Sequence, residues 1–211
     1  AKPKAGYFFM VLKGQGAKSM ILDVRGNPGG LVDSVASIAS EFLKDKQEIV
    51  SFRKQGQLMF KHVADGDGEF ANMPVTVLVD EGSASASEIL AATMQDQRKG
   101  YSVIGSRSYG KGTQQAILPG ADKGGLKITQ SRWHGPNGAN IDAQHDPATG
   151  EKVKGTGGVM PDIDVPVAEK DAQAIAQQTA YELMGRPIPN RVPDPVLEKA
   201  IEVLTNAGKN G

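Results

Sequence analysis

The stretch PVTVLVDEGSASASEILAATMQDQR, residues 74–98, joins a strand-like run to a helix-like run through a short polar turn. Its first seven residues are almost continuously apolar, which is typical of a strand buried on both faces. The run after the turn predicts a helix that extends to about Arg98. A buried strand that leads directly into a helix is the building unit of a mixed α/β domain, so this stretch decides the fold class.

The remaining segments support the same α/β prediction. The apolar runs and predicted strands are Gly6–Leu12, Ser19–Val24, a hairpin over 47–63 that turns near Gln55-Gly56, Tyr101–Gly105, Gly112–Leu118, Leu126–Trp133 and the PDIDVPV segment. The predicted helices are Leu31–Lys46, Glu169–Met184 and Pro195–Asn206. Between His134 and Gly158 the chain is rich in Gly, Pro and Asp, which indicates a long functional loop or a mobile insertion.

Composition excludes several function classes. The 211 residues carry 24 basic and 24 acidic side chains without a basic stripe, which argues against nucleic acid as a partner. No apolar run is long enough to span a bilayer. The chain has no cysteine, so it can form neither a disulfide nor a thiolate metal site, and its three histidines leave little room for a histidine cage.

Three serines, Ser83, Ser85 and Ser87, alternate with alanines at the turn. One interpretation is structural: Ser85 and Glu88 have the spacing of a capping box, in which the serine oxygen accepts from the third N–H of the helix. The other is catalytic, because a serine on a sharp strand-to-helix turn lies beside unpaired N–H groups that can stabilise an oxyanion. The repeat alone does not choose among the three hydroxyls.

Lys111 is the candidate base, because a serine hydroxyl needs a group that takes its proton. It lies between Gly110 and Gly112, and these glycines allow its backbone to pack closely against another segment. Burial there would favour the neutral amine that a general base requires. The alternative is a lysine that only extends into solvent.

The DVRGNPGG segment, residues 23–30, is a glycine-rich turn between a predicted strand and a predicted helix. The glycine spacing matches neither the dinucleotide fingerprint nor the phosphate loop of nucleotide hydrolases, so nucleotide binding is not expected. Either Gly29 and Gly30 present a backbone N–H to a developing negative charge, or the segment is only a tight turn.

In this order the motifs resemble the carboxyl-terminal processing peptidases, or tail-specific proteases, which are Ser-Lys endopeptidases of the S41 type. The similarity covers roughly Ser19 to Val167 and rests on DVRGNPGG, VLVDEGSASASEILAATMQD, YGKGTQQ, SRWHGPNGANID and GVMPDIDV. It implies the crotonase-like, ClpP-like β-β-α core of that family. We therefore expect a protease core over residues 1–167, without an evident PDZ domain, and a helical extension over residues 168–211.

The resemblance also implies the roles of five residues. Ser85, the middle hydroxyl of the serine motif, corresponds to the nucleophile, and Lys111 corresponds to the general base. Gln115 corresponds to the glutamine that orients this lysine. The backbone N–H groups of Gly30 and Ala86 correspond to the oxyanion hole. This chemistry uses no metal and no organic cofactor.

Other expectations concern partners and location. The resemblance implies protein substrates with apolar C-terminal tails, and it leaves room for an adaptor or regulatory protein and for a homo-oligomer. It implies a bacterial periplasm or cell envelope, or an organelle lumen. We expect Asp96 to be a structural anchor that pairs with Arg98 or Arg25.

Two other functions remain open from the sequence. The chain could be a catalytically silent or partner-dependent crotonase-like scaffold. An acyl-CoA enzyme of the crotonase type is the weaker alternative, because no pair of carboxylates suited to that chemistry is visible.

Overall fold

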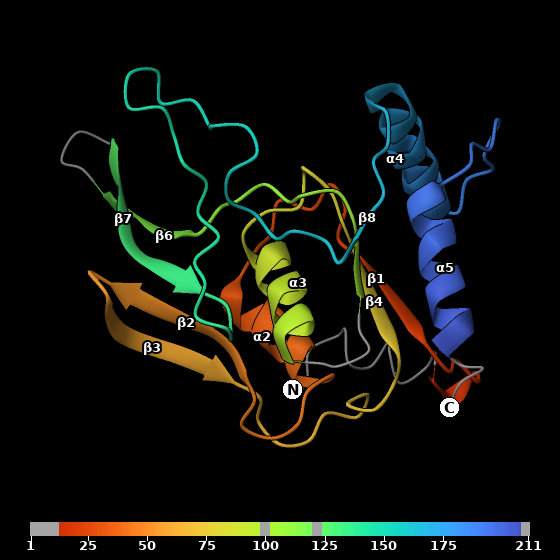
Figure 1. Ribbon diagram of the computed structural model, residues 1–211, viewed down its shortest axis with the longest axis horizontal. Coiled ribbons are helices and arrows are strands. Elements are labelled where there is room, and N and C mark those ends of the chain that lie inside the picture. Colours follow the sequence, from red (N-terminus) through yellow and green to blue (C-terminus); the bar gives the residue numbers. More distant parts are fainter. Residues whose placement is uncertain (1–12, 98–101, 120–123, 208–211) are drawn as a thin grey trace.

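The computed structural model describes residues 13–97, 102–119 and 124–207. In these ranges two four-stranded sheets lie on opposite sides of a central pair of helices, and two further helices pack at the far side of one sheet (Figure 1). The strands are β1 (Met20–Asp23), β2 (Glu48–Lys54), β3 (Gln57–Val63), β4 (Val75–Val79), β5 (Ser102–Gly105), β6 (Thr113–Pro119), β7 (Gly125–His134) and β8 (Ile163–Asp164). The helices are α2 (Val32–Ser40), α3 (Ala86–Gln97), α4 (Glu169–Leu183) and α5 (Pro195–Ala207).

The first sheet has the order β1-β4-β5-β8, and every pairing in it is parallel. Every residue of β4 is buried, as the continuous apolar run predicts. Because successive side chains of a strand point to opposite faces, Val77 joins the core beneath α2 and α3, whereas Leu78 packs with Ile104, Val196 and Ala200. Helix α5 therefore covers the outer face of the parallel sheet.

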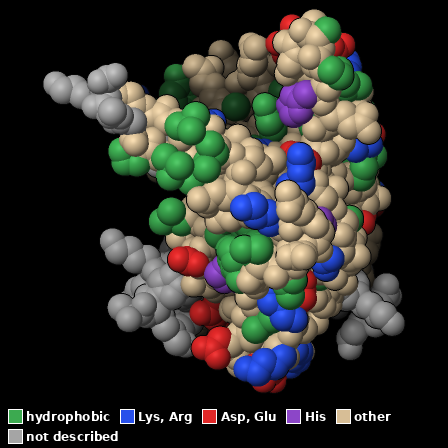
Figure 2. All heavy atoms as spheres, turned by 90° about the vertical axis from the view of Figure 1, so that its left-hand side faces the viewer, with side chains coloured by type: hydrophobic (Ala, Val, Ile, Leu, Met, Phe, Trp, Pro, Cys, Tyr) green, Lys and Arg blue, Asp and Glu red, His purple; other side chains and the backbone are tan. Residues whose placement is uncertain are grey.

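The second sheet is antiparallel, with the order β3-β2-β7-β6. The predicted hairpin turn is confirmed: Gln55 and Gly56 both have positive φ, 50° and 81°, which is the geometry of tight hairpin turns. Phe52 of β2 pairs with Trp133 of β7, and both side chains are buried against the core. This sheet also exposes the apolar side chains of Leu58, Met59, Phe60, Leu118 and Leu126. Hydrophobic side chains gather at several places on the side of the molecule that Figure 2 shows.

The predicted helix Leu31–Lys46 is too long, because α2 ends at Ser40. The next residues continue as a tight turn, in which Phe42 and Leu43 donate their N–H groups to the carbonyls three residues earlier. The turn keeps both side chains fully buried, so the helical spacing of apolar residues continues past the end of the helix.

The PDIDVPV segment forms only the two-residue strand β8, shorter than predicted, and the other predicted elements are confirmed within one or two residues where the structure describes them. The apolar run Gly6–Leu12, together with Arg98 and Tyr101, lies outside the described residues. The excursion from His134 to Gly158 contains a single isolated β-bridge, His145 with Lys152. Among the described helices none has both the length and the apolar character that crossing a membrane requires.

Candidate active site

Ser85 lies where the turn after β4 becomes helix α3, and its backbone is unusual. Its φ is 56°, which places a residue other than glycine in the left-handed region. A helix N-cap normally has extended backbone, and the Ser85 hydroxyl does not cap α3: no bond joins its Oγ to another described residue. The structural interpretation of this serine is thus wrong for the hydroxyl, which is left available at the start of the helix.

The neighbouring serines, Ser83 and Ser87, are packed into the protein interior. Ser83 is fully buried; its Oγ donates to the Val24 carbonyl over 2.8 Å and accepts from the Asp80 N–H. Ser87 is also buried, within the first turn of α3. Ser85 is the most accessible of the three.

The turn of DVRGNPGG packs directly against the serine turn. The Asn27 carbonyl accepts from the Ala84 N–H over 3.0 Å. A Cβ atom on Gly29 would lie 2.7 Å from the Ala86 nitrogen and 2.9 Å from Ser85 Cβ, so no larger residue fits there without a shift. The structure thus brings residues about 55 positions apart into contact around Ser85.

Two backbone N–H groups of these packed turns have no acceptor in the described part of the chain. The Gly29 N–H donates to the Asn27 side chain over 2.9 Å and is therefore occupied. By contrast, neither the Gly30 N–H nor the Ala86 N–H donates to an acceptor within the described part of the chain. The geometry is compatible with the predicted oxyanion hole of Gly30 and Ala86, and it argues against Gly29 as a donor.

Glu88 is the residue whose importance the sequence did not reveal. Its side chain is fully buried in the first turn of α3. One carboxylate oxygen accepts from the Ser85 N–H over 2.8 Å and from the Lys111 N–H over 2.9 Å. The other accepts from the Ser108 hydroxyl and from the Gly110 N–H, both over 2.6 Å. The capping-box spacing predicted only the first of these four bonds.

Through Glu88 the backbones of Ser85 and Lys111 become neighbours. Because 2.8 Å and 2.9 Å separate the two backbone nitrogens from the same oxygen, these nitrogens are no more than 5.7 Å apart. The structure therefore brings together the backbones of the two predicted dyad residues; their catalytic roles stay a prediction.

The close packing expected around Lys111 is confirmed. A Cβ on Gly112 would lie 2.7 Å from the Asp142 nitrogen, and one on Gly110 would lie 2.9 Å from the Gly158 nitrogen. The indole N–H of Trp133 donates to the Lys111 carbonyl over 2.9 Å. The excursion after β7 is thus the partner segment that holds the lysine backbone.

The burial expected for the Lys111 side chain is not observed, because the residue is exposed. The glycines bury the backbone on both sides, but the side chain leaves this packed segment toward solvent. Gln115 lies on β6 and is also exposed, next to a register shift between β6 and β7. Its role in orienting the lysine stays a prediction.

Asp96 anchors a loop, but not through the predicted partners. Its carboxylate accepts from the backbone and side-chain N–H groups of Asn137 over 3.2 Å and 3.0 Å. Burial raises the pKa of the Asp96 carboxyl, and although the bonds from Asn137 oppose this, its pKa remains above the ordinary value. The pairing with Arg25 is wrong, because Arg25 binds two other carboxylates, and Arg98 lies outside the described residues.

In the described ranges no group of three or more His, Asp or Glu side chains is placed to bind a metal ion.

The sheets, the central helices and the serine turn define an α/β protein of the ClpP- and crotonase-like class. Within that class the chain belongs to peptidase family S41, whose family model matches residues 4–165. Both the predicted fold and the predicted family are confirmed.

Two curated relatives illustrate the similarity. The chain is 43% identical over 126 residues to a carboxy-terminal-processing protease of Bartonella bacilliformis, covering 59% of this chain and 28% of the relative. It is 32% identical over 210 residues to a probable CtpA-like serine protease of Staphylococcus epidermidis, covering 90% of this chain and 40% of the relative. The chain thus spans less than half the length of these relatives.

Solved structures show the same likeness. The photosystem II D1 C-terminal processing protease superposes with a TM-score of 0.64 at 31% identity, over 76% of this chain and 38% of that one. A putative peptidase from Parabacteroides merdae superposes with a TM-score of 0.65 at 20% identity, over the whole of this chain and 59% of that one. The second likeness concerns the fold alone.

Proposed function

We propose that this chain is the catalytic part of a serine endopeptidase that cleaves proteins near or from their C-terminal tails. The observation that carries the proposal is the Glu88 carboxylate, which holds the backbones of Ser85 and Lys111 together at the start of α3. Membership of family S41 supports the same activity.

The reaction is acyl transfer. Lys111, as the free amine, removes the Ser85 proton while Oγ attacks the scissile carbonyl. The N–H groups of Gly30 and Ala86, together with the positive end of the α3 dipole, stabilise the negative oxygen of the tetrahedral intermediate. The C–N bond then breaks and the lysine returns the proton to the leaving amine. Water repeats these steps on the acyl-enzyme, which releases the new C-terminus and regenerates Ser85.

The exposed lysine gives substrate binding a second role. A lysine acts as a general base only as the free amine. A peptide bound over the site would exclude water from Lys111 and favour the neutral amine. Activity would then depend on a substrate, or another covering segment, that seals the dyad.

Exposed apolar side chains close in sequence to the proposed site residues support a preference for substrates with apolar tails. Leu31, which follows the oxyanion glycine Gly30, is 77% exposed, and Tyr109, two residues before the base, is 44% exposed. Apolar groups at this position would gain by being covered with an apolar peptide. The relatives described as carboxy-terminal processing proteases support a tail as the substrate. An envelope or lumenal location stays a prediction from the resemblance.

A fluorophosphonate label tests the nucleophile directly, because it bonds only to an activated serine. We expect mass spectrometry to find one adduct, on Ser85. Ser85→Ala and Lys111→Ala should each abolish both the adduct and the cleavage of a protein with an apolar tail. Ser87→Ala is the matched control, since this buried serine lies two positions away on the same helix turn. Normal cleavage by Ser85→Ala would disprove the assignment.

The exposure of Lys111 also keeps one alternative in view, a silent or partner-dependent scaffold. Such a protein would bind a tail peptide without forming an adduct or releasing a product. Fluorophosphonate labelling of the wild-type chain with the peptide, and without any partner protein, separates the two functions. A protease forms the adduct on Ser85, whereas a scaffold forms none.

A further inference from the structure

An ion pair links the C-terminal helices to the turn that carries the oxyanion glycine. Asp194 lies just before α5, and Arg25 lies in the DVRGNPGG turn after β1. The Arg25 guanidinium donates to both oxygens of Asp194, over 3.0 Å and 2.8 Å. This two-bond arrangement is the most directional that an arginine and a carboxylate can form. The Asp194 side chain is only 6% exposed and that of Arg25 only 13%.

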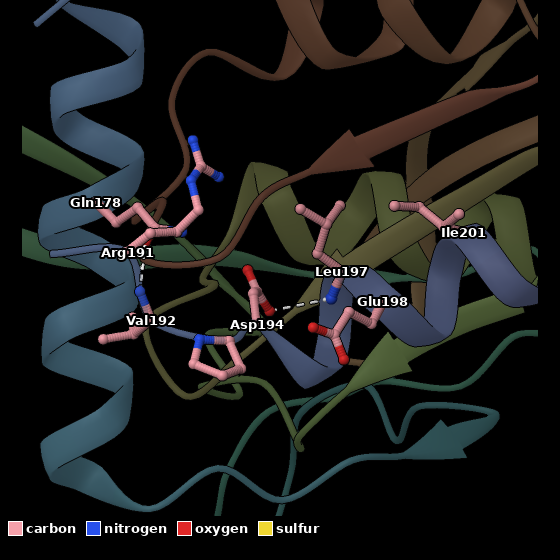
Figure 3. Close-up of a pocket in the computed structure, with 8 residues that line it drawn as sticks. Gln178, Arg191, Val192, Asp194, Leu197, Glu198 and Ile201 are labelled. Carbon is pink, nitrogen blue, oxygen red and sulfur yellow. Dashed lines mark hydrogen bonds between the residues drawn. The ribbon is translucent and has the colours of Figure 1, made fainter. Parts of the chain in front are cut away.

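Asp194 is itself held firmly. Its carboxylate accepts from the Leu197 N–H over 3.0 Å and so caps the start of α5, as the dashed line in Figure 3 shows. Helix α5 in turn packs through Val196 and Ala200 onto the outer face of the parallel sheet. The carboxylate is therefore a fixed point, located beside a pocket of about 460 Å³ between α4 and α5 that contains none of the proposed catalytic residues.

The turn on the other side of this ion pair has few anchors of its own. Residues 26–28 and Gly30 are exposed, and two of these four are glycines, which have no side chain that could pack. Its backbone is anchored by the Gly26 N–H to Asp80 over 2.8 Å, by the Asn27 N–H to Val24 and carbonyl to Ala84, and by the packing of Gly29 on the serine turn. Arg25 is the only residue of this turn, all of which is described, whose side chain binds the residue that precedes α5. Its remaining donors bind Asp23, next to it on β1.

Both partners are charged at neutral pH. Burial raises the pKa of the Asp194 carboxyl, but the bonds from Arg25 and from the backbone of α5 outweigh it and hold the pKa below its ordinary value. Burial lowers the pKa of the Arg25 guanidinium, and the two aspartates more than reverse this.

From this geometry we propose that Asp194 is a positioning residue of the active site: through Arg25 it fixes the turn that presents the Gly30 N–H to the oxyanion. The role of Gly30 rests on the proposed function; the mechanical link does not. Asp194 touches no substrate, so its effect appears in the transition state and not in peptide binding.

Asp194→Asn tests the link with the smallest change. Asparagine is nearly isosteric and caps helices as well as aspartate does, so α5 keeps its start while the ion pair is lost. We expect kcat to fall about tenfold with little change in KM, because misplacement of one oxyanion donor costs catalysis and not ground-state binding. Affinity for a peptide aldehyde, which forms the tetrahedral oxyanion, should fall by a similar factor. Affinity for the product peptide should not change.

Glu198→Gln is the matched control, since Glu198 lies one helical turn away in the same pocket and is exposed. Arg25→Lys should resemble Asp194→Asn, and the double variant should be no worse than either, because all three remove the same bond. If kcat of Asp194→Asn matches that of wild type, or if Glu198→Gln loses as much, the proposal is wrong.

Hydrogen exchange tests the link independently of catalysis. In Asp194→Asn, amides of the peptide spanning residues 24–31 should exchange several-fold faster than in Glu198→Gln, whereas those of β4 should not change. If the wild-type protein has no protease activity but Asp194→Asn shows the faster exchange, the proposed function is wrong and the link through Arg25 stands. If the wild-type protein is active but Asp194→Asn exchanges like Glu198→Gln, the link is wrong and the proposed function stands. If Asp194→Asn unfolds, Arg25→Lys carries the same comparison.

Discussion

Glu88→Gln is the most informative single change at the site. The substitution preserves the shape of the side chain but replaces one carboxylate oxygen by an NH₂ group, which cannot accept a hydrogen bond. With the NH₂ in the position that faces Ser85 and Lys111, both backbone N–H groups lose their acceptor. In the opposite orientation the Ser108 hydroxyl can rotate and accept a hydrogen bond from the NH₂ group. Only the Gly110 N–H then faces the NH₂ group and has no acceptor. We expect the second orientation.

The magnitude follows from these contacts. A hydrogen bond to a charged group contributes about 1.5–3 kcal/mol, and a buried donor left without an acceptor costs about 1–3 kcal/mol. The Gly110 N–H would lack an acceptor, and the other three hydrogen bonds would be weaker because the side chain has lost its charge. The free energy of unfolding should therefore fall by about 3 kcal/mol. Because the Gly110 backbone leads into Lys111, we also expect kcat to fall by about a hundredfold while the protein is still folded.

Urea unfolding followed by circular dichroism measures the stability, and cleavage at a temperature where both proteins are folded measures the rate. Glu81→Gln is the control, because Glu81 lies on the same turn and is exposed. If Glu88→Gln unfolds at the wild-type urea concentration and cleaves at the wild-type rate, the carboxylate does not hold the proposed dyad together and the reasoning fails.

Three further predictions follow from other contacts. Gly112→Ala should lower stability by about 2 kcal/mol in urea unfolding and reduce cleavage, because its Cβ would meet the backbone of Asp142; an unchanged unfolding midpoint would contradict this. Thr76→Val should raise stability by about 1 kcal/mol, since the buried Thr76 hydroxyl has no partner among the described residues; a loss in the same assay would mean that the hydroxyl is satisfied. The difference in unfolding free energy between wild type and Asp194→Asn should be largest above pH 4 and decrease as the pH falls further, because the folded-state pKa of Asp194 lies below its unfolded value. A difference that does not depend on pH would exclude the ion pair as its source.

Local patterns predicted most of the secondary structure, because each depends on neighbours in the chain. The hairpin turn at Gln55-Gly56, the buried run of β4 and the glycines beside Lys111 all have a physical reason within a few residues. The end of α2 was missed because Phe42 and Leu43 keep the helical spacing while the backbone turns. Apolar periodicity reports which side chains are buried, and not where a helix stops.

The candidate site could be predicted only in part. The serine motif and the lysine motif are visible in the sequence, and the resemblance assigned their roles. The four bonds of Glu88 and the pairing of Arg25 with Asp194, 169 positions away, depend on tertiary contacts that no local pattern encodes. The exposure of Lys111 could not be predicted either, since the flanking glycines determine how its backbone packs but not where its side chain points.

The left-handed backbone of Ser85 also makes the active site a source of instability. A residue with a Cβ in this conformation is less stable than glycine by about 1 kcal/mol or more. Ser85→Ala keeps that strain, whereas Ser85→Gly removes it together with the proposed nucleophile. The glycine variant should therefore unfold at a higher urea concentration than the alanine variant, although glycine also makes the unfolded chain more flexible. Ser85→Gly would therefore be a better variant than Ser85→Ala for capturing an uncleaved tail, because the substitution that should stop the reaction also removes the backbone strain at residue 85.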